Sequence, residues 1–270
     1  MQRLRLSPSG ISAFQECPTK YFYKSRRWEP KVKPPALYAG SLGHQVMAAL
    51  YKEGFQGAQK ELNGIRATFS QLPQEEQENF GDVPGLLEFL LGNYMGEYTD
   101  TARVDPRLVE KGICVAITPQ ISLYGIADVI FPDGEILDHK FTRTIPKEDE
   151  ALLTNAQLTM YAFLVEQGMG IEVKRVTLNY LQRYIYKTKG HDSSEYFRRY
   201  SVPYSRAVGL NIVADVLAVA EMIKWAENHE YFPHTFSFRC KMCSYRSVCT
   251  AAVRGVNPYD ILGQNFVQRE

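Results

Sequence analysis

Two aspartates and a lysine stand on adjacent apolar segments near the middle of the chain. Asp128 lies on one segment, and Asp138 and Lys140 lie on the next. Because side chains alternate along a strand, Asp138 and Lys140 share one face while His139 points the other way. Leaving either charge unpaired in an apolar setting costs about 3–5 kcal/mol. The cluster therefore favours a bound counter-ion.

Mg²⁺ or Mn²⁺ is the counter-ion that suits these groups, because hard cations prefer carboxylate and carbonyl oxygens. Such an ion polarises a phosphate and lowers the pKa of a bound water. Lys140 could then orient or deprotonate that water and offset the phosphate charge. A simple ion pair between Asp138 and Lys140 at a strand end is the alternative interpretation.

Four cysteines form a second constellation with metal-ligand spacing. Cys240, Cys243 and Cys249 make a C-x₂-C-x₅-C pattern, and Cys17 lies more than two hundred residues upstream. Four thiolates can hold either an iron–sulfur cluster or a tetrahedral zinc ion, and chemistry alone does not separate the two. Either metal would join the ends of the chain as a structural staple. Cys114, flanked by aliphatic residues, is predicted to be a buried strand residue.

Hydrophobic periodicity predicts the elements that position these groups. Helices are expected at residues 8–17, after Gly40, at 149–167 and at 205–227. Strands are expected at residues 108–117, 121–131, 135–141 and 173–184, with Pro132-Asp133-Gly134 as a hairpin turn. A helical insertion at residues 54–105, most loop-like at 71–82, and a cysteine-rich tail at 234–249 complete one domain over residues 1–270.

Composition restricts the classes of partner and location. The hydrophobic content of 45% is enough for a core, and 31 basic against 30 acidic residues give a net charge of +1. The net charge is therefore too small to attract a polyanion, so any contact with nucleic acid must use local clusters of positive charge. No signal peptide opens the sequence, and charged residues interrupt its most apolar late stretch. We expect no membrane insertion and a cytoplasmic protein of a bacterial, archaeal or phage-infected cell.

Four short motifs stand in the order found in RecB-like nucleases of the PD-(D/E)XK superfamily. They are Gly40-Ser41-Leu42-Gly43-His44 (G-x-x-x-H), Gly125-Ile126-Ala127-Asp128 (G-x-x-D), Asp138-His139-Lys140 (D-x-K) and Gln157-Leu158-Thr159-Met160-Tyr161 (Q-x-x-x-Y). On these motifs the chain resembles that family from Ser7 to Cys249, apart from the helical insertion. Ala127 stands where the eponymous proline would be, and Asp138 replaces the more general glutamate.

The resemblance implies a restriction-endonuclease-like core, α/β in class, with a central mixed β-sheet flanked by helices. It implies metal ligands at His44, Asp128, Asp138 and the main-chain carbonyl of His139, and catalytic positions at Asp128, Asp138, Lys140, Gln157 and Tyr161. Gln157 and Tyr161 lie four residues apart on one helix face, which suits positioning of a nucleotide or of the lysine. A buried polar pair is the alternative for these two. Glu110, which no motif fixes, is left outside the core site.

The cysteine arrangement is also similar to that of iron–sulfur members of this group, which include AddB-type and CRISPR-associated exonucleases. These proteins have one cysteine after an N-terminal helix and three near the C-terminus. The resemblance implies a [4Fe–4S] cluster on Cys17, Cys240, Cys243 and Cys249, with structural Zn²⁺ as the alternative.

Basic and aromatic residues interleave in two stretches, as in channels for single-stranded nucleic acid. The first group contains Tyr21, Phe22, Tyr23, Lys24, Arg26, Arg27, Trp28, Lys31 and Lys33. The second contains Arg183, Tyr184, Tyr186, Lys187, Lys189, Tyr196, Phe197, Arg198 and Arg199. Solvated charge on ordinary loops is the alternative. Because no base-reading motif is present, we expect low sequence specificity on single-stranded DNA or frayed ends.

These observations predict a metal-dependent DNA nuclease, an exonuclease in recombination, repair, phage DNA processing or CRISPR adaptation. A catalytically silent iron–sulfur subunit that binds DNA or scaffolds a larger nuclease complex is the second hypothesis. An electron-transfer protein is the third. The intact Asp128, Asp138 and Lys140 argue against both alternatives, and protein partners are left open.

Overall fold

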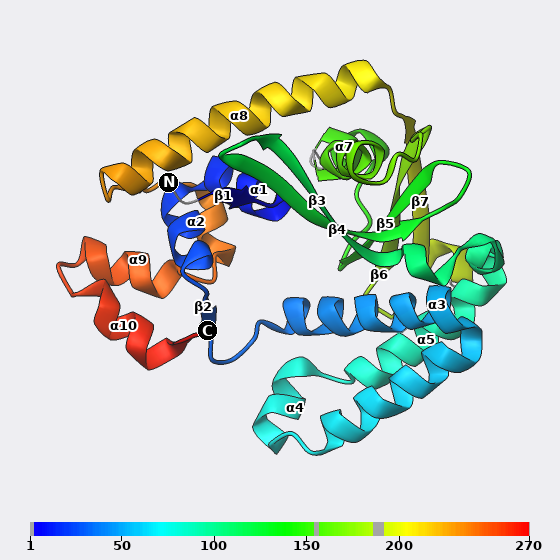
Figure 1. The fold of residues 1–270 in the computed structure, drawn as a ribbon. Helices are drawn as coiled ribbons and strands as arrows, with labels where there is room; N and C mark the ends of the chain where they lie inside the picture. Colours follow the sequence, from blue (N-terminus) through cyan, green and yellow to red (C-terminus); the bar gives the residue numbers. More distant parts are fainter. Residues whose placement is uncertain (1–2, 154–156, 186–191, 270) are drawn as a thin grey trace. The chain divides into compact units, whose positions relative to one another are not determined.

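The computed structural model describes residues 3–153, 157–185 and 192–269 (Figure 1). The chain divides into two compact units, each assembled from separate stretches of sequence. The smaller unit comprises Met1–Pro34, Ala116–Leu123 and Asn211–Glu270, and the larger unit comprises Pro35–Val115 and Tyr124–Leu210. The single nuclease domain expected over residues 1–270 stays a prediction.

A mixed β-sheet forms the centre of the larger unit. Its strands are β3 (Val109–Thr118), β4 (Ile121–Ile130), β5 (Glu135–Thr142), β6 (Arg175–Gln182) and β7 (Phe197–Pro203). Strand β3 pairs with β4, after which β4, β5, β6 and β7 follow in spatial order. Strands β5 and β6 are parallel, whereas β4 with β5 and β6 with β7 are antiparallel. The predicted α/β fold with a central mixed sheet is therefore confirmed.

The hairpin turn between β4 and β5 sets the position of the acidic residues. Gly134 has a φ of 90°, and a side chain there would collide with the carbonyl oxygen of Glu172. Only glycine adopts such a backbone conformation without cost. The resulting register pairs Val129 with Leu137, which brings Asp128 alongside the next residues of β5.

Helices α3 (Pro35–Ser70) and α5 (Val83–Glu97) cover one face of this sheet, and α7 (Gln157–Met169) lies on the other side of it in Figure 1. The helix predicted after Gly40 begins earlier, at Pro35, and runs on to Ser70 with a break at Gly54. The short helix α4 (Gln74–Phe80) occupies most of residues 71–82, so the loop predicted there is wrong. Two short 3₁₀ helices, η1 (Asp100–Arg103) and η2 (Pro106–Leu108), lead into β3.

The second half of the larger unit departs from the sequence prediction in two places. The helix expected at 149–167 is described as α6 (Glu148–Leu153) and α7, and residues 154–156 lie outside the described residues. After the 3₁₀ helix η3 (Ser193–Tyr196), β7 adds an edge strand that the sequence analysis did not predict. Its polar sequence lacks a clear two-residue alternation.

In the smaller unit, the N-terminal and C-terminal stretches pack against each other. It contains β1 (Leu4–Leu6), α1 (Pro8–Glu16), α2 (Pro18–Ser25), β2 (Trp28–Pro30), most of α8 (Arg206–Asn228), η4 (Phe238–Met242), α9 (Arg246–Val253), α10 (Pro258–Asn265) and β8 (Phe266–Gln268). Strand β1 pairs in parallel with Ile121–Leu123, the start of β4, and β2 pairs with β8. As predicted, Ser7 caps α1, accepting a hydrogen bond from the Gly10 N–H at 3.1 Å.

None of the helices in the described part of the chain is both long enough and apolar enough to cross a membrane.

Candidate active site

Asp128 is held at the centre of the site by the strand next to it. Its Oδ2 accepts a hydrogen bond of 2.7 Å from the backbone N–H of His139 on β5. The same oxygen lies 3.3 Å from Nδ1 of His44, which α3 carries over the sheet. Burial would raise the pKa of Asp128, but His44 and His139 outweigh it and hold the pKa below its ordinary value. Asp128 therefore stays ionised in the resting site.

The contact between Asp128 and His44 also shifts the pKa of His44, but upward. Burial would lower its pKa, yet the hydrogen bond and charge of Asp128, with Asp138 and Glu110, raise the pKa of the imidazole in net. A cation is thus favoured at this position. A protonated histidine or a metal ion can meet that demand.

Glu110, which the sequence analysis left outside the core site, lies next to His44 and Asp128. One ligand atom each from His44, Glu110 and Asp128 lie within 4.8 Å of one another. Glu110 has a φ of 51° at the start of β3, a left-handed conformation that is strained for a residue with a side chain. Burial and the charge of Asp128 raise the pKa of Glu110. The only signal in the sequence was an acidic residue opening a strand.

Asp138 and Lys140 form an ion pair beside this group, with Nζ 2.7 Å from Oδ2. Asp138 is only 5% exposed, and its Oδ2 accepts no hydrogen bond of good geometry from a described residue. Burial raises the pKa of Asp138, and Lys140 offsets this only in part. Burial would lower the pKa of Lys140, but Asp138 and Asp128 raise it in net, so its ammonium is retained. The sequence expectation that these two groups lie together is met.

Two glycines let helices approach these strands closely. A side chain at Gly43 on α3 would collide with the ring of Phe141 on β5. A methyl at Gly125 on β4 would lie 2.8 Å from both Tyr161 and Leu164 of α7. Gly125 of one motif therefore makes room for Tyr161 of another. Gln157 lies at the first turn of the same helix, α7.

The His139 side chain points away from the metal-ligand candidates into a buried polar network. Its Nδ1 accepts a 2.8 Å hydrogen bond from the amide of Asn179, so the ring proton resides on Nε2. Burial lowers the pKa of His139 to about 3, and the ring is neutral. Asn179 also donates to the Tyr94 hydroxyl at 2.9 Å. The imidazole, which had no predicted task, thus anchors the strand between Asp138 and Lys140.

The donor set fits a hard divalent cation. Two carboxylates and an imidazole converge, and a third carboxylate, Asp138, is buried with unsatisfied hydrogen-bonding capacity. Mg²⁺ and Mn²⁺ prefer such oxygen-rich sites.

The sequence matches the model of the PD-(D/E)XK nuclease superfamily over residues 5–250, which is most of the chain. This chain belongs to the PD-(D/E)XK nuclease superfamily. Nucleases of this superfamily use divalent metal ions, in keeping with the donor set described above.

Comparison with solved structures supports the fold. The nuclease is similar to a protein solved as "Putative exonuclease" from Eubacterium rectale, with 14% identity, a TM-score of 0.59, and coverage of 87% of this chain and 85% of that one. It also matches a structure named SSO0001, with 17% identity over 93% of this chain and 88% of that one, but the TM-score of 0.42 carries no argument. The sequence matches no curated protein.

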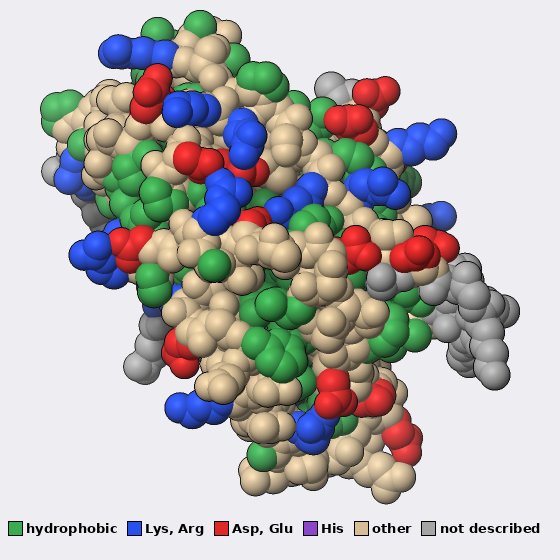
Figure 2. Space-filling model, turned by 90° about the vertical axis from the view of Figure 1, so that its right-hand side faces the viewer, with side chains coloured by type: hydrophobic (Ala, Val, Ile, Leu, Met, Phe, Trp, Pro, Cys, Tyr) green, Lys and Arg blue, Asp and Glu red, His purple; other side chains and the backbone are tan. Residues whose placement is uncertain are grey.

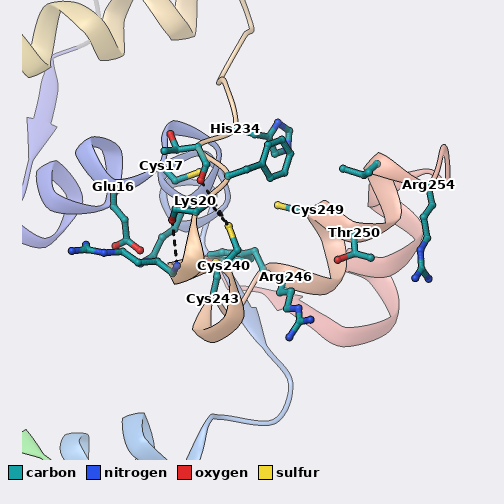
Figure 3. A pocket seen from close by; sticks show the side chains of 16 residues that line it. Glu16, Cys17, Lys20, His234, Cys240, Cys243, Arg246, Cys249, Thr250 and Arg254 are labelled. Atoms are coloured by element: carbon teal, nitrogen blue, oxygen red, sulfur yellow. Dashed lines mark hydrogen bonds and ion pairs between the residues drawn. The ribbon is translucent and has the colours of Figure 1, made fainter.

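In the smaller unit of the nuclease, all four predicted cluster cysteines line one cavity of about 230 Å³ (Figure 3). Cys17 sits in extended conformation between α1 and α2, Cys240 lies in η4, Cys243 follows it, and Cys249 lies in α9. Burial and the neighbouring thiols raise the pKa of Cys249 to about 11. The cavity is also lined by basic side chains, namely Lys20, Arg239, Arg246 and Arg254.

Cys114 lies apart from this cavity, on β3. Its strand assignment agrees with the prediction, but the expected burial is wrong because the side chain is exposed. The inward position is taken by Ile113, which is 6% exposed.

In the first basic and aromatic group, two tyrosines belong to the interior of the smaller unit, whereas the basic residues Lys24, Arg26, Arg27, Lys31 and Lys33 are exposed. Tyr21 and Tyr23 are buried, and Tyr23 packs with Tyr245 and Phe266 in a core cluster. These tyrosines are therefore unavailable to stack on DNA bases, which corrects the prediction. Arg26 forms an ion pair with Glu227 at 2.7 Å.

The second group is divided between the core and the surface. Tyr196 and Phe197 are buried, and Arg199 bonds Asp100 at 2.7 Å, so these three are also unsuited to DNA contact. Tyr184 and Arg198 are exposed. Tyr186, Lys187 and Lys189 lie outside the described residues. On the face drawn in Figure 2, basic and acidic side chains are interspersed instead of forming one basic field.

Proposed function

We propose that this nuclease is a metal-dependent deoxyribonuclease that acts as an exonuclease on single-stranded DNA or DNA ends with low sequence specificity. The observation that carries the proposal is the convergence of His44, Glu110 and Asp128 beside the Asp138–Lys140 pair. Carboxylates, an imidazole and a retained ammonium are the groups that metal-assisted phosphodiester hydrolysis needs.

The proposed metal ligands are His44, Glu110, Asp128, Asp138 and the main-chain carbonyl of His139. A bound Mg²⁺ or Mn²⁺ supplies positive charge for the phosphate and lowers the pKa of a coordinated water. Lys140, held against Asp138, donates hydrogen bonds that orient the attacking water and offsets the charge of the phosphate.

Tyr161 and Gln157 are proposed to position the nucleotide. Burial and the carboxylates of Asp138, Asp128 and Glu110 raise the pKa of Tyr161. The phenol consequently keeps its proton and can donate a hydrogen bond to a phosphate oxygen. Gln157 lies one helical turn before Tyr161 and shares its face of α7.

Cutting of end-labelled oligonucleotides in Mg²⁺ or Mn²⁺ tests this proposal. We expect cutting by the wild type, loss with a chelator, and loss in Asp128→Ala, Asp138→Ala and Lys140→Ala. Glu75→Gln is a matched control, because Glu75 is an exposed carboxylate on α4. Full activity of Asp138→Ala would refute the assignment. DNA binding by a wild type that cuts nothing would favour a silent DNA-binding subunit.

The preference for single strands or ends rests on the near-neutral net charge and on the aromatic and basic side chains that stay exposed. Rates should fall as salt rises, because phosphate contacts release counterions. Equal cutting of a blunt duplex and a single strand across salt concentrations would argue against the preference.

We further propose that Cys17, Cys240, Cys243 and Cys249 hold one [4Fe–4S] cluster with a structural role. The spacing of the sulfurs supports iron over zinc. A tetrahedral zinc ion with Zn–S bonds near 2.3 Å holds its sulfurs about 3.8 Å apart. Among the described residues, no three cysteine sulfurs lie within 4.8 Å of one another, although all four line one cavity.

Anaerobic purification with metal analysis tests the cluster. We expect brown protein with broad absorption near roughly 400 nm and loss of iron and stability in Cys17→Ser. Cys114→Ser, an exposed cysteine outside the cavity, should keep its iron. Colourless protein with stoichiometric zinc would refute the iron assignment.

A further inference from the structure

The carboxyl ends of β5 and β6 lie side by side beyond the catalytic lysine. Their parallel register pairs Lys140 with Tyr180 and continues to the pair of Thr142 with Gln182. The backbone N–H of Arg183 then donates to the carbonyl of Thr142 at 2.7 Å. This bond places Arg183 beside the start of the segment that follows β5, where Arg143 is the next residue.

These two arginines carry positive charge that no described carboxylate neutralises. Neither forms an ion pair with a described acidic residue, and Nε of Arg183 is buried without a described hydrogen-bond partner. Burial and the like charge of Arg143 lower the pKa of Arg183. At the amino end of β6, by contrast, Arg175 pairs with Glu135 at 2.7 Å. The carboxyl end is therefore suited to bind an anion.

An exposed aromatic ring stands next to the two arginines. Tyr184 is 41% exposed, and the guanidinium carbon of Arg143 lies 5.9 Å from its ring centroid. Cations that follow a phosphate backbone and a ring that stacks on a base are the two parts of a site for single-stranded nucleic acid. All the groups lie on the larger unit, which also carries Asp138 and Lys140.

We propose that Arg143, Arg183 and Tyr184 form a nucleotide subsite of the nuclease. The guanidinium groups bind a phosphate of the DNA strand, and Tyr184 stacks on the adjacent base. Arg143 follows Lys140 by three residues, about 10 Å along an extended chain, so the subsite lies beyond the catalytic lysine at the carboxyl ends of β5 and β6. The inference rests on the proposed deoxyribonuclease function and adds the residues that hold the strand outside the catalytic site.

Equilibrium binding of a fluorescein-labelled oligothymidylate tests the subsite, with Ca²⁺ replacing Mg²⁺ and salt varied. Each phosphate contact to a single strand contributes about 0.7 to the slope of log K against log salt. We expect Arg143→Gln and Arg183→Gln each to reduce the slope by about that amount. Arg183→Lys, which keeps the charge in a partly buried position, should retain most of it. Arg107→Gln should not change the slope, because Arg107 is exposed and paired with Asp105 at 2.6 Å.

Stacking is tested separately with an oligonucleotide that lacks bases. Tyr184→Ala should weaken binding of the normal strand by roughly fivefold or more, whereas Tyr184→Trp should restore it. On the abasic strand, the wild type and Tyr184→Ala should bind alike.

Thermal unfolding followed by circular dichroism confirms that each variant is folded before its binding is measured. Folded arginine variants with the wild-type salt slope, from a wild type that cuts DNA, would overturn the subsite alone. A wild type that neither cuts nor binds DNA would overturn the proposed function and the subsite with it.

Discussion

Replacing Arg199 with methionine is expected to destabilise the larger unit strongly. Nη1 of Arg199 on β7 donates to Asp100 in η1 at 2.7 Å. Its Nη2 donates to the hydroxyls of Tyr94 at 2.7 Å and Tyr51 at 3.1 Å. Tyr94 also accepts from Asn179, which in turn holds His139. One guanidinium therefore links the helical segment before β3 to the strand of the D-x-K motif.

The size of the stability loss depends on Asp100, which the variant leaves without its cationic partner. Asp100 is 9% exposed, so its carboxylate would remain desolvated without a cation. Removing one partner of a buried ion pair costs about 3–5 kcal/mol. Because the Tyr51 hydroxyl would still donate to Asp100 at 3.1 Å, we expect a loss near the lower end, about 3 kcal/mol.

Urea unfolding followed by circular dichroism measures this loss as a change in the free energy of unfolding. Arg66→Met is the control, since Arg66 on α3 lies 2.9 Å from Glu88 on α5 in the same unit, but both side chains are about half exposed. An exposed pair of this kind contributes at most about 1 kcal/mol. Equal losses in the two variants would refute the reasoning from burial.

Three further predictions concern the site. Gly43→Ala should cost about 1–3 kcal/mol of unfolding free energy, because its methyl would overpack against Phe141. Gly40→Ala should be tolerated, because its methyl would lie an ordinary 3.9 Å from Phe141. Equal stability of both variants in urea would contradict this. Gly125→Ala should reduce cutting as well as stability, because it pushes Tyr161 and Leu164 away from β4, and an unchanged cutting rate would argue against a positioning role for Tyr161. Glu110→Gln should weaken Mn²⁺ binding measured by calorimetry, and an unchanged affinity would remove Glu110 from the ligand set.

Local patterns in the sequence were enough to predict the centre of the sheet and the clustering of several site residues. The alternation in β4 and β5 and the turn at Gly134 place Asp128 next to His139. The structure also gives a physical reason for two motifs to occur together, because Gly125 accommodates Tyr161.

Features that depend on distant partners were not predictable. Tyr23 was read as a DNA contact, but its partners Tyr245 and Phe266 lie more than two hundred residues away and make it part of a core. Arg199 is engaged by Asp100, which precedes it by 99 positions, and is therefore not available to DNA. No local periodicity reports such pairs.

Glu110 shows a different limit of sequence reasoning. Its carboxylate reaches His44 and Asp128 from a left-handed backbone conformation with a φ of 51°. Glutamate rarely adopts this conformation, so propensity alone gives no indication of it.

Single-turnover cutting by Lys140→Met tests the central claim most directly, because methionine keeps much of the side-chain bulk and removes only the ammonium. Lys60→Met, an exposed lysine on α3, is the control. We predict that Lys140→Met folds, binds DNA and Mn²⁺, and cuts at least about 100-fold more slowly than the wild type and the control. Cutting at the wild-type rate in Mg²⁺ would contradict the assignment of this site as the catalytic centre.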